Sequence, residues 1–193
     1  MEKKNGTAVY LHTDTKLTSF LDSLPDVDLE ASYYLLVLSG PNKAGKKEFM
    51  KKLEKKMGVF DKIDLGTLIN QYEEDSYQKI NEVFTYIGET EKNLLLTNGD
   101  VLAGEYTGFT YSTVRYATPQ EKYLLEKIKG SERFFVIEIQ EFENIDKTLE
   151  RYSQAIVRFQ RPDTFFGKLF WNLRNITIHG HRFANKRPSS PAG

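Results

Sequence analysis

The stretch from Tyr33 to Met57 constrains the fold of this chain more strongly than any other part of the sequence. It opens on a continuous apolar run, Tyr33–Leu38, of the kind found in strands that are buried on both faces. A glycine-punctuated loop follows, and then apolar residues recur at the spacing of one helix face: Phe49, Met50, Leu53 and Met57. A buried strand that passes through a short loop into an amphipathic helix is typical of a parallel sheet covered by helices. The chain is therefore predicted to have an α/β fold.

The loop between this strand and this helix carries the spacing Gly-x4-Gly-Lys, from Gly40 to Lys46. In phosphate-binding loops (P-loops) with this spacing, backbone N–H groups, the helix N-terminus and the lysine side chain all point at the phosphates of a nucleotide. ATP or ADP is therefore the ligand that the loop predicts. The residues expected to contact it are Gly40, Asn42, Lys43, Ala44, Gly45, Lys46 and Lys47.

Position 47 departs from this motif. The motif places a serine or threonine hydroxyl there to hold Mg²⁺, whereas Lys47 can only donate hydrogen bonds and carries the same charge as the metal. The loop amides, the helix dipole and Lys46 are still able to grip phosphates without the metal, with Lys47 or Lys43 supplying part of the missing positive charge. The motif is thus stronger evidence for the fold than for catalysis.

Composition excludes several classes of protein. Lys and Arg total 27, as do Asp and Glu, so no net charge attracts the chain to nucleic acid or to an anionic membrane. The absence of cysteine excludes disulfides and Cys-ligated metals, and it is compatible with a reducing compartment. No stretch approaches the roughly 20 apolar residues of a membrane span, and the N-terminus lacks the apolar run of a signal peptide. We therefore expect a soluble cytoplasmic protein that binds neither membranes nor nucleic acid.

The remainder of the chain alternates between short apolar runs and helical patterns, which extends the prediction to a three-layer α/β sandwich with a mainly parallel sheet. A capping box, Thr118-Pro119-Gln120-Glu121, marks the start of one helix. Residues 104–118 have no clear period and are predicted to form a loop, whose aromatic side chains either cap the core or form an exposed contact surface. Strands are predicted at 8–11, 33–38, 59–65, 93–97, 133–140, 155–159 and, at an edge, 175–179, and helices at 17–21, 47–57, 68–87, 118–129 and 144–152.

Taken as a series from Tyr33 to Pro162, these elements resemble the large subdomain of an AAA+ ATPase, a type of P-loop NTPase. In this resemblance the glycine loop stands at the Walker A position, Leu94–Leu102 at the Walker B strand, and Phe135–Gln140 at the sensor-1 strand. Glu150–Pro162 stands at the arginine-finger region and the last strand. The resemblance implies protein partners and a larger assembly, because AAA+ domains act as rings.

The residues at the Walker B position differ from those of the family. Hydrolysis needs two carboxylates there, one for the Mg²⁺ shell and one to polarise the attacking water. Thr97 and Asn98 occupy these places, and neither carries a charge. Asp100 follows two residues later and is a poor substitute, because it is expected to lie beyond the strand in a loop.

The arginine finger is altered as well, while sensor 1 keeps a polar residue. Gln140 is able to position water beside a γ-phosphate. Arg151 is left as a single finger residue, because Glu150 has the wrong sign for an anionic transition state. Metal holder, catalytic carboxylate and finger pair are thus changed together, which predicts a pseudo-ATPase without catalytic residues rather than an enzyme.

The expected domain organisation follows from the extent of this resemblance. Residues 1–32 are predicted to be an N-terminal extension with a short strand and helix, 33–162 the AAA+-like domain, 163–183 an aromatic C-terminal extension and 184–193 a disordered tail. Only about 30 residues follow Pro162, so no helical lid domain is expected. His12, His179 and His181 have no acidic residue spaced to complete a metal site, and no metal is predicted.

Three functions fit these observations. The first is a catalytically degenerate AAA+-like domain that acts as a structural or regulatory protein-interaction subunit. The second is a nucleotide-binding protein or slow ATPase that uses the loop Gly40–Lys47, with a partner donating the missing carboxylate. The third is a module that binds an anion other than ATP in the same loop.

Overall fold

The computed structural model of the chain describes residues 2–4, 7–29, 32–90, 92–103 and 117–161. The described residues up to Gln160 belong to one compact unit. Most of the predicted loop 104–118 lies outside the described residues, as do the predicted extension 163–183 with its edge strand 175–179 and the predicted tail 184–193.

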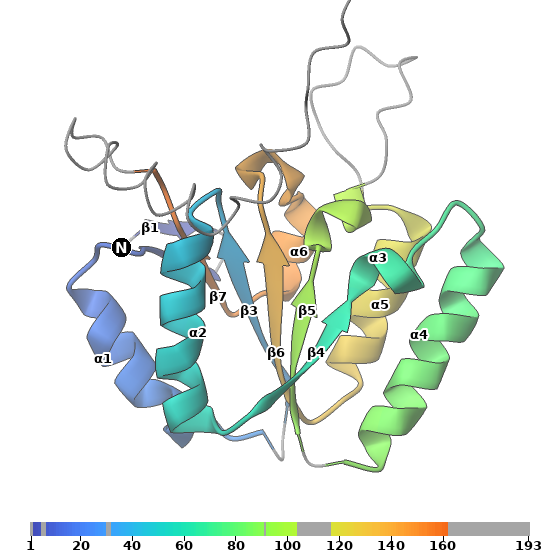
Figure 1. Ribbon diagram of the computed structural model, residues 1–193, viewed down its shortest axis with the longest axis horizontal. Helices are drawn as coiled ribbons and strands as arrows, with labels where there is room; N and C mark the ends of the chain where they lie inside the picture. Colours follow the sequence, from blue (N-terminus) through green and yellow to red (C-terminus); the bar gives the residue numbers. More distant parts are fainter. Residues whose placement is uncertain (1, 5–6, 30–31, 91, 104–116, 162–193) are drawn as a thin grey trace, which may run out of the picture. The chain divides into compact units, whose positions relative to one another are not determined.

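The described residues form a seven-stranded sheet with the strand order β1-β2-β7-β3-β6-β5-β4 (Figure 1). Strand β1 (Glu2–Lys4) pairs antiparallel with β2, and all the other pairs are parallel. The predicted, mainly parallel sheet is confirmed. Its parallel strands are β2 (Thr7–Leu11), β3 (Tyr34–Ser39), β4 (Phe60–Asp64), β5 (Asn93–Thr97), β6 (Phe134–Ile139) and β7 (Ala155–Arg158).

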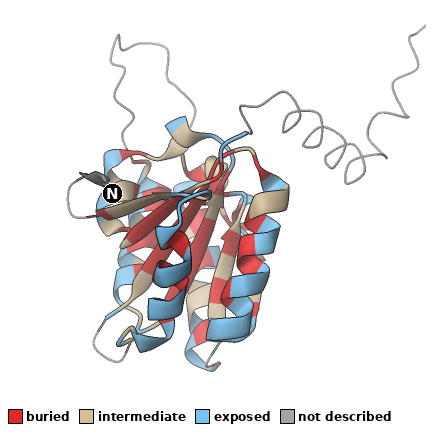
Figure 2. Ribbon diagram, turned by 90° about the vertical axis from the view of Figure 1, so that its left-hand side faces the viewer, coloured by how far each residue is buried: buried red, intermediate tan, exposed pale blue. Residues whose placement is uncertain are grey.

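Helices cover both faces of the sheet, which confirms the three-layer sandwich (Figures 1 and 2). One face carries α1 (Lys16–Ser23), the turn η1 (Leu24–Asp26) and α2 (Lys43–Met57). The opposite face carries α3 (Leu65–Leu68), α4 (Glu73–Gly88), α5 (Pro119–Lys129) and α6 (Lys147–Tyr152), with the turns η2 (Gly99–Ala103) and η3 (Phe142–Asn144) after β5 and β6.

Strand β3 illustrates why the central strands are continuously apolar. Leu35 and Val37 belong to the core under α4 and α5, and Leu36 and Leu38 to the core under α1 and α2. All four side chains are completely buried. Because successive side chains of a strand point to opposite faces, a strand covered on both sides needs apolar residues at every position.

The helix predicted over 68–87 is wrong at its N-terminal end. The chain forms the short α3, leaves the helix after Leu68 and starts α4 only at Glu73. Ser76 is completely buried and holds this break, because its hydroxyl accepts a hydrogen bond of 3.1 Å from the Asn70 amide and donates one of 3.0 Å to the Tyr72 carbonyl. A buried serine at a helical position leaves the apolar spacing unchanged, so periodicity alone did not reveal the break.

The predicted capping box at the start of α5 is confirmed. The Thr118 hydroxyl accepts the Glu121 amide at 3.1 Å, and Pro119 occupies the first helical turn. Among the described residues, all helices pack on the sheet, and none builds a separate lid. No helix of the described part is long and apolar enough to cross a membrane.

Candidate functional site

A groove of about 640 Å³ lies at the carboxyl ends of β5 and β6, beside the N-terminal half of α2. Parallel sheets bind their ligands at this edge. The groove unites segments that are far apart in the sequence: the predicted loop lysines, the Walker B positions Thr97 and Asn98, and the sensor-1 residue Gln140. Five lysines line it, namely Lys43, Lys46, Lys47, Lys51 and Lys62, together with the acids Glu54, Asp100 and Glu138.

Helix α2 begins inside the predicted phosphate-binding loop. Its first residue is Lys43, and Asn42 caps it by accepting the Gly45 amide on its side-chain oxygen at 2.9 Å. The Lys46 amide donates to the Asn42 carbonyl at 3.1 Å, and the Lys43 amide to the Pro41 carbonyl at 2.9 Å. Three of the amides expected to face phosphates are therefore bonded within the loop itself.

Gly40 has a packing role in this arrangement. Its φ of 111° lies in a region that favours glycine. A Cβ atom at this position would overlap the Phe159 carbonyl oxygen and lie 2.6 Å from Cζ of Phe142. The Gly40 amide also donates to the Ile139 carbonyl at 3.0 Å. The close approach of β6, β7 and the loop is thus sufficient to require glycine here.

The motif lysine, Lys46, is turned into the protein. Its side chain is 3% exposed, and Nζ donates a hydrogen bond of 2.6 Å to the carbonyl oxygen of Ile139, at the end of β6. Burial lowers the pKa of the Lys46 ammonium, and the nearby carboxylates of Glu138 and Asp100 act in the opposite direction. A phosphate at the loop would have to draw Nζ away from this carbonyl.

Asp100 lies in η2, beyond the end of β5, as expected. Its Oδ2 accepts the Gln140 amide at 2.8 Å, and its Oδ1 accepts the Glu141 amide at 3.0 Å and the Asn144 side-chain amide at 2.7 Å. Both carboxylate oxygens therefore hold the segment that follows β6. Asp100 is a positioning residue for the sensor-1 loop.

Thr97 and Asn98 lie at the Walker B position, and the side chains of both contact neighbouring segments of the backbone. The Thr97 hydroxyl donates to the Ile63 carbonyl at 3.3 Å. Asn98 has a φ of 60°, which asparagine tolerates better than most residues, and its side-chain amide lies against Gly66 of α3. This end of β5 thus presents a hydroxyl and an amide to the groove, with no carboxylate.

Glu138 is one of the charged groove residues that no sequence motif indicated, together with Lys51, Glu54 and Lys62. It is half-buried in β6 and shares a sheet face with Phe134 and Val136, so it points toward α2 and the motif lysine. The available signal was a single acid near the end of an otherwise apolar strand, Phe134–Ile139. Its carboxylate brings negative charge to the place where a nucleotide's phosphates would add more.

The two finger-region residues lie away from this groove. Arg151 is exposed on α6 and Glu150 is half-buried on the same helix, and neither lines the groove. The predicted absence of a metal site stays a prediction. Among the described residues no three His, Asp or Glu side chains gather around a point that would hold a metal ion, and His179 and His181 lie outside them.

A second groove, of about 660 Å³, lies on the other side of α2, toward α1. His12 stands at its end and stacks on Phe159 with 5.5 Å between the ring centroids. Gly45 also borders it, so residues of the predicted loop line both grooves, on the two sides of α2. The stacked His12 ring has a packing role at the end of β2 and β7.

Comparison with known proteins gives similarity at the level of the fold. No protein-family model and no curated protein matches the sequence. The crystal structure of the FIGL-1 AAA domain in complex with ADP aligns with a TM-score of 0.56 and 14% identity, over 85% of this chain and 58% of that one. The Escherichia coli MS115-1 HORMA:CdnC:Trip13 complex aligns with a TM-score of 0.49 and 14% identity, over 83% of this chain and 61% of that one. The first of these similarities shows that this protein has the α/β fold of an AAA domain, and the chain spans 58% of the length of that structure.

Proposed function

We propose that this chain is a catalytically degenerate AAA+-like domain that acts as a structural or regulatory protein-interaction subunit, without appreciable ATP hydrolysis. One observation carries the proposal: the end of β5 presents Thr97 and Asn98 to the groove where hydrolysis needs carboxylates. The nearest acid after them, Asp100, holds three donors of the sensor-1 loop with its two oxygens. Moving it to a metal would dismantle that loop.

The state of the loop supports the same proposal. The amides of Lys43, Gly45 and Lys46 have partners inside the loop, and Lys46 Nζ is bonded to Ile139. A nucleotide would have to replace these bonds as well as provide its own. The absence of cysteine supports placing this function in the cytoplasm.

A second candidate is a nucleotide-binding protein or a slow, partner-completed ATPase, with ATP or ADP in the loop Gly40–Lys47. The five lysines of the groove favour it, because they provide positive charge for phosphates without a metal. The similar FIGL-1 AAA domain was crystallised with ADP. In this candidate Lys47 takes over part of the charge that Mg²⁺ would supply.

Turnover and binding measurements on the full chain separate the two candidates. We expect no ATP hydrolysis above that of Lys46→Met, a variant that keeps most of the aliphatic stem and removes the charge. Lys52→Met, on the far side of α2, is the matched control. Mg²⁺-dependent turnover that is lost in Lys46→Met and kept in Lys52→Met would overturn the proposal. Saturable ADP binding without turnover, measured by calorimetry with and without Mg²⁺, would establish the second candidate in its binding form.

A further inference from the structure

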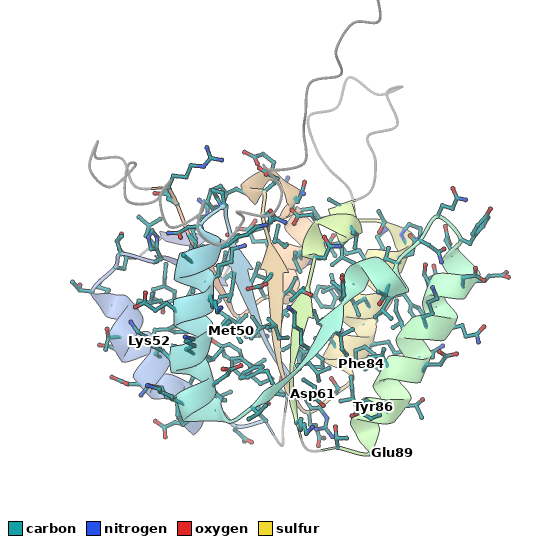
Figure 3. The ribbon with its side chains drawn as sticks, in the orientation of Figure 1. Met50, Lys52, Asp61, Phe84, Tyr86 and Glu89 are labelled. Atoms are coloured by element: carbon teal, nitrogen blue, oxygen red, sulfur yellow. The ribbon has the colours of Figure 1, made fainter. Side chains whose placement is uncertain are left out.

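The sheet ends in a strand whose outer edge is unpaired. Strand β4 stands last in the strand order, and it pairs in parallel with β5 along its whole length, from Phe60 to Asp64. In the part of the chain that the structure describes, no strand pairs with its other side. In Figure 3 Asp61 marks β4, with Met50 of α2 on one side and Phe84 of α4 on the other. The backbone N–H and C=O groups of such an edge form a template for pairing with a further strand.

Lys62 presents the backbone groups of this edge at the middle of β4. The Ile63 carbonyl accepts the Thr97 hydroxyl of β5 at 3.3 Å, so it is directed toward β5. Successive residues of a strand direct their N–H and C=O groups to opposite neighbours, so both groups of Lys62 are directed away from β5. Among the described residues, no backbone group outside the sheet bonds to Lys62. An added strand can therefore bond to Lys62 without disturbing the pair of β4 and β5.

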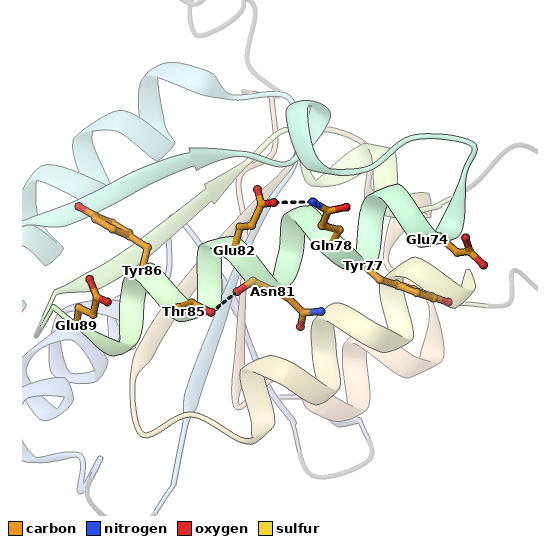
Figure 4. Close-up of a pocket in the computed structure, with 8 residues that line it drawn as sticks. All are labelled: Glu74, Tyr77, Gln78, Asn81, Glu82, Thr85, Tyr86 and Glu89. Carbon is orange, nitrogen blue, oxygen red and sulfur yellow. Dashed lines mark hydrogen bonds between the residues drawn. The ribbon is translucent and has the colours of Figure 1, made fainter.

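One side of β4 borders a trough of about 480 Å³ that lies between this strand and α4. Four apolar or aromatic side chains line the trough: Ile63, Leu68, Val83 and Tyr86. Tyr86 is 54% exposed, and Val59, the residue before β4, is 72% exposed. Figure 4 shows Tyr86 together with Glu82, which also lines the trough and accepts a hydrogen bond of 3.0 Å from Gln78. We call this surface the α4 trough.

Two other charged residues of the α4 trough have partners within the protein. Asp61 pairs with Lys92 at 3.1 Å, and Lys79 donates to the Thr67 carbonyl at 3.0 Å. The apolar side chains are thus the groups that the trough leaves for a ligand to contact, and they favour apolar side chains from a partner.

The opposite side of β4 faces α2 and is positively charged. Lys62 lines the candidate functional groove there, together with Lys47 and Lys51 of α2. All three lysines are exposed, and within the described residues no ion pair joins any of them to an acid. Glu54 is the single acid that α2 adds to this groove. This side of β4 therefore favours an acidic partner.

A strand added to β4 would meet both of these sides at once. Phe60 belongs to the core under α2, and Ile63 packs against the core under α4, because alternate residues of a strand face opposite sides of the sheet. Residues placed opposite Asp61 and Ile63 would enter the α4 trough, and a residue placed opposite Lys62 would meet the lysines of α2. The two sides together therefore select a strand that alternates between apolar and acidic residues.

We propose that the outer edge of β4 binds an extended segment of another protein, in which apolar residues alternate with acidic ones, by β-strand addition. Backbone hydrogen bonds along the edge hold such a segment, and the two sides of β4 select its side chains. The proposal names the class of partner for the protein-interaction function proposed above and in that sense rests on it. The ATP measurements do not depend on it, so either proposal can fail alone.

The charge of Lys62 opposes a second copy of this chain on the same edge. If two β4 strands pair antiparallel around Lys62, their two Lys62 side chains lie opposite each other, and like charges in that position are destabilising. Lysine on an edge strand is a common means of preventing such self-pairing. An acidic residue opposite Lys62 gives an attractive pair instead.

Fluorescence anisotropy of the full chain with a labelled seven-residue peptide of alternating valine and glutamate tests the proposal. We expect saturable binding, and much weaker binding of a peptide that alternates valine and lysine. Lys62→Pro removes the outward N–H as well as the charge and should weaken binding about tenfold, whereas Lys62→Thr removes the charge alone and should weaken it less. Tyr86→Ser removes part of the trough lining and should weaken binding about fivefold. The matched control, Tyr72→Ser, lies at an exposed position outside the trough and should bind like the parent.

Amide hydrogen exchange of the parent chain locates the peptide on the edge. Binding should slow exchange of the Lys62 N–H, which is directed away from β5, and should leave that of Ile63 nearly unchanged. Undetectable binding, equal binding by Lys62→Pro and the parent, or unchanged exchange at Lys62 would overturn the proposal. Dimerisation of the parent in sedimentation velocity that Lys62→Pro abolishes would also overturn it, because a second copy would then occupy the edge. Circular dichroism of each variant confirms that the chain is folded.

Discussion

The ammonium group of Lys46 and the carbonyl oxygen of Ile139 lie 2.6 Å apart and join the start of α2 to the end of β6. The same carbonyl also accepts the Gly40 amide at 3.0 Å, so three segments converge on one oxygen. In the phosphate-binding motif this lysine reaches for a nucleotide's β- and γ-phosphates. Here the protein itself supplies the acceptor, which has consequences for stability as well as for binding.

Replacing Lys46 with methionine should stabilise the ligand-free protein. Burial lowers the Lys46 pKa, which means that the charged form is held at a cost, and the Ile139 carbonyl keeps its bond from Gly40 after the exchange. Urea unfolding at pH 7 should give a free energy of unfolding higher by on the order of 1 kcal/mol. Lys52→Met, at an exposed position, should change it little. A marked loss of stability in Lys46→Met alone would show that the ammonium is a net stabilising group.

Removal of the Asp100 carboxylate should loosen the segment after β6. Asp100→Ala leaves three donors without their acceptor, and a loss on the order of 3 kcal/mol in the free energy of unfolding is expected. Asp100→Asn keeps one acceptor oxygen and should lose less. Glu143→Ala, at an exposed position in η3, is the control and should be nearly neutral. Equal stability of Asp100→Ala and the parent would contradict a positioning role.

Glu121 should make stability fall as pH rises. Its carboxyl is 2% exposed, and burial together with the neighbouring Asp146 carboxylate raises its pKa from 4.5 to about 8. Asp146 holds the amides of Thr148 and Leu149 on Oδ1, and its buried Oδ2 has no partner outside this pair among the described residues. A protonated Glu121 can donate to it.

The direction of this pH dependence follows from the raised pKa of Glu121. Below pH 4.5 Glu121 is protonated in both the folded and the unfolded chain. Between pH 4.5 and 8 only the unfolded chain releases the proton, which lowers the free energy of unfolding by about 1.4 kcal/mol per pH unit. Glu121→Gln cannot ionise, so its stability advantage over the parent should grow between pH 5 and pH 7.5 in urea titrations. Glu132→Gln, at an exposed site, is the control. An advantage that stays constant with pH would refute the raised pKa.

Restoring the metal-binding chemistry should improve nucleotide binding. Lys47 and Asn98 line the same groove, so Lys47→Thr/Asn98→Glu places a hydroxyl and a carboxylate in that groove. Calorimetry should then show ADP binding at least tenfold tighter in the presence of Mg²⁺ than that of the parent. Lys47→Thr alone should recover less, because it lacks the carboxylate. Undetectable binding by the double variant would mean that the loop conformation, and not only its side chains, opposes the ligand.

The order of the elements was predictable because it depends on neighbours along the chain. The apolar run in β3 needs cover on both faces wherever it lies, and the Thr118 cap is a bond across three residues. The predicted strands 93–97 and 133–140 appear as β5 and β6 for the same reason. The break before α4 was missed, because a buried Ser76 bonded to Asn70 does not disturb the apolar spacing.

The sequence by itself determined the α/β class, the strand-loop-helix unit around Gly40 and the chemistry missing at Thr97 and Asn98, because these are properties of residue type and spacing. The hydrogen bond of the Lys46 side chain depended on folding. Its acceptor, the Ile139 carbonyl, lies 93 residues away and comes close only when β3 and β6 pair. The groove that unites the loop lysines with Thr97, Asn98 and Gln140 likewise exists only once the strands pair and α2 covers the sheet. Spacing along a chain sets which groups a helix or strand presents, but only the packing of the layers sets what those groups meet.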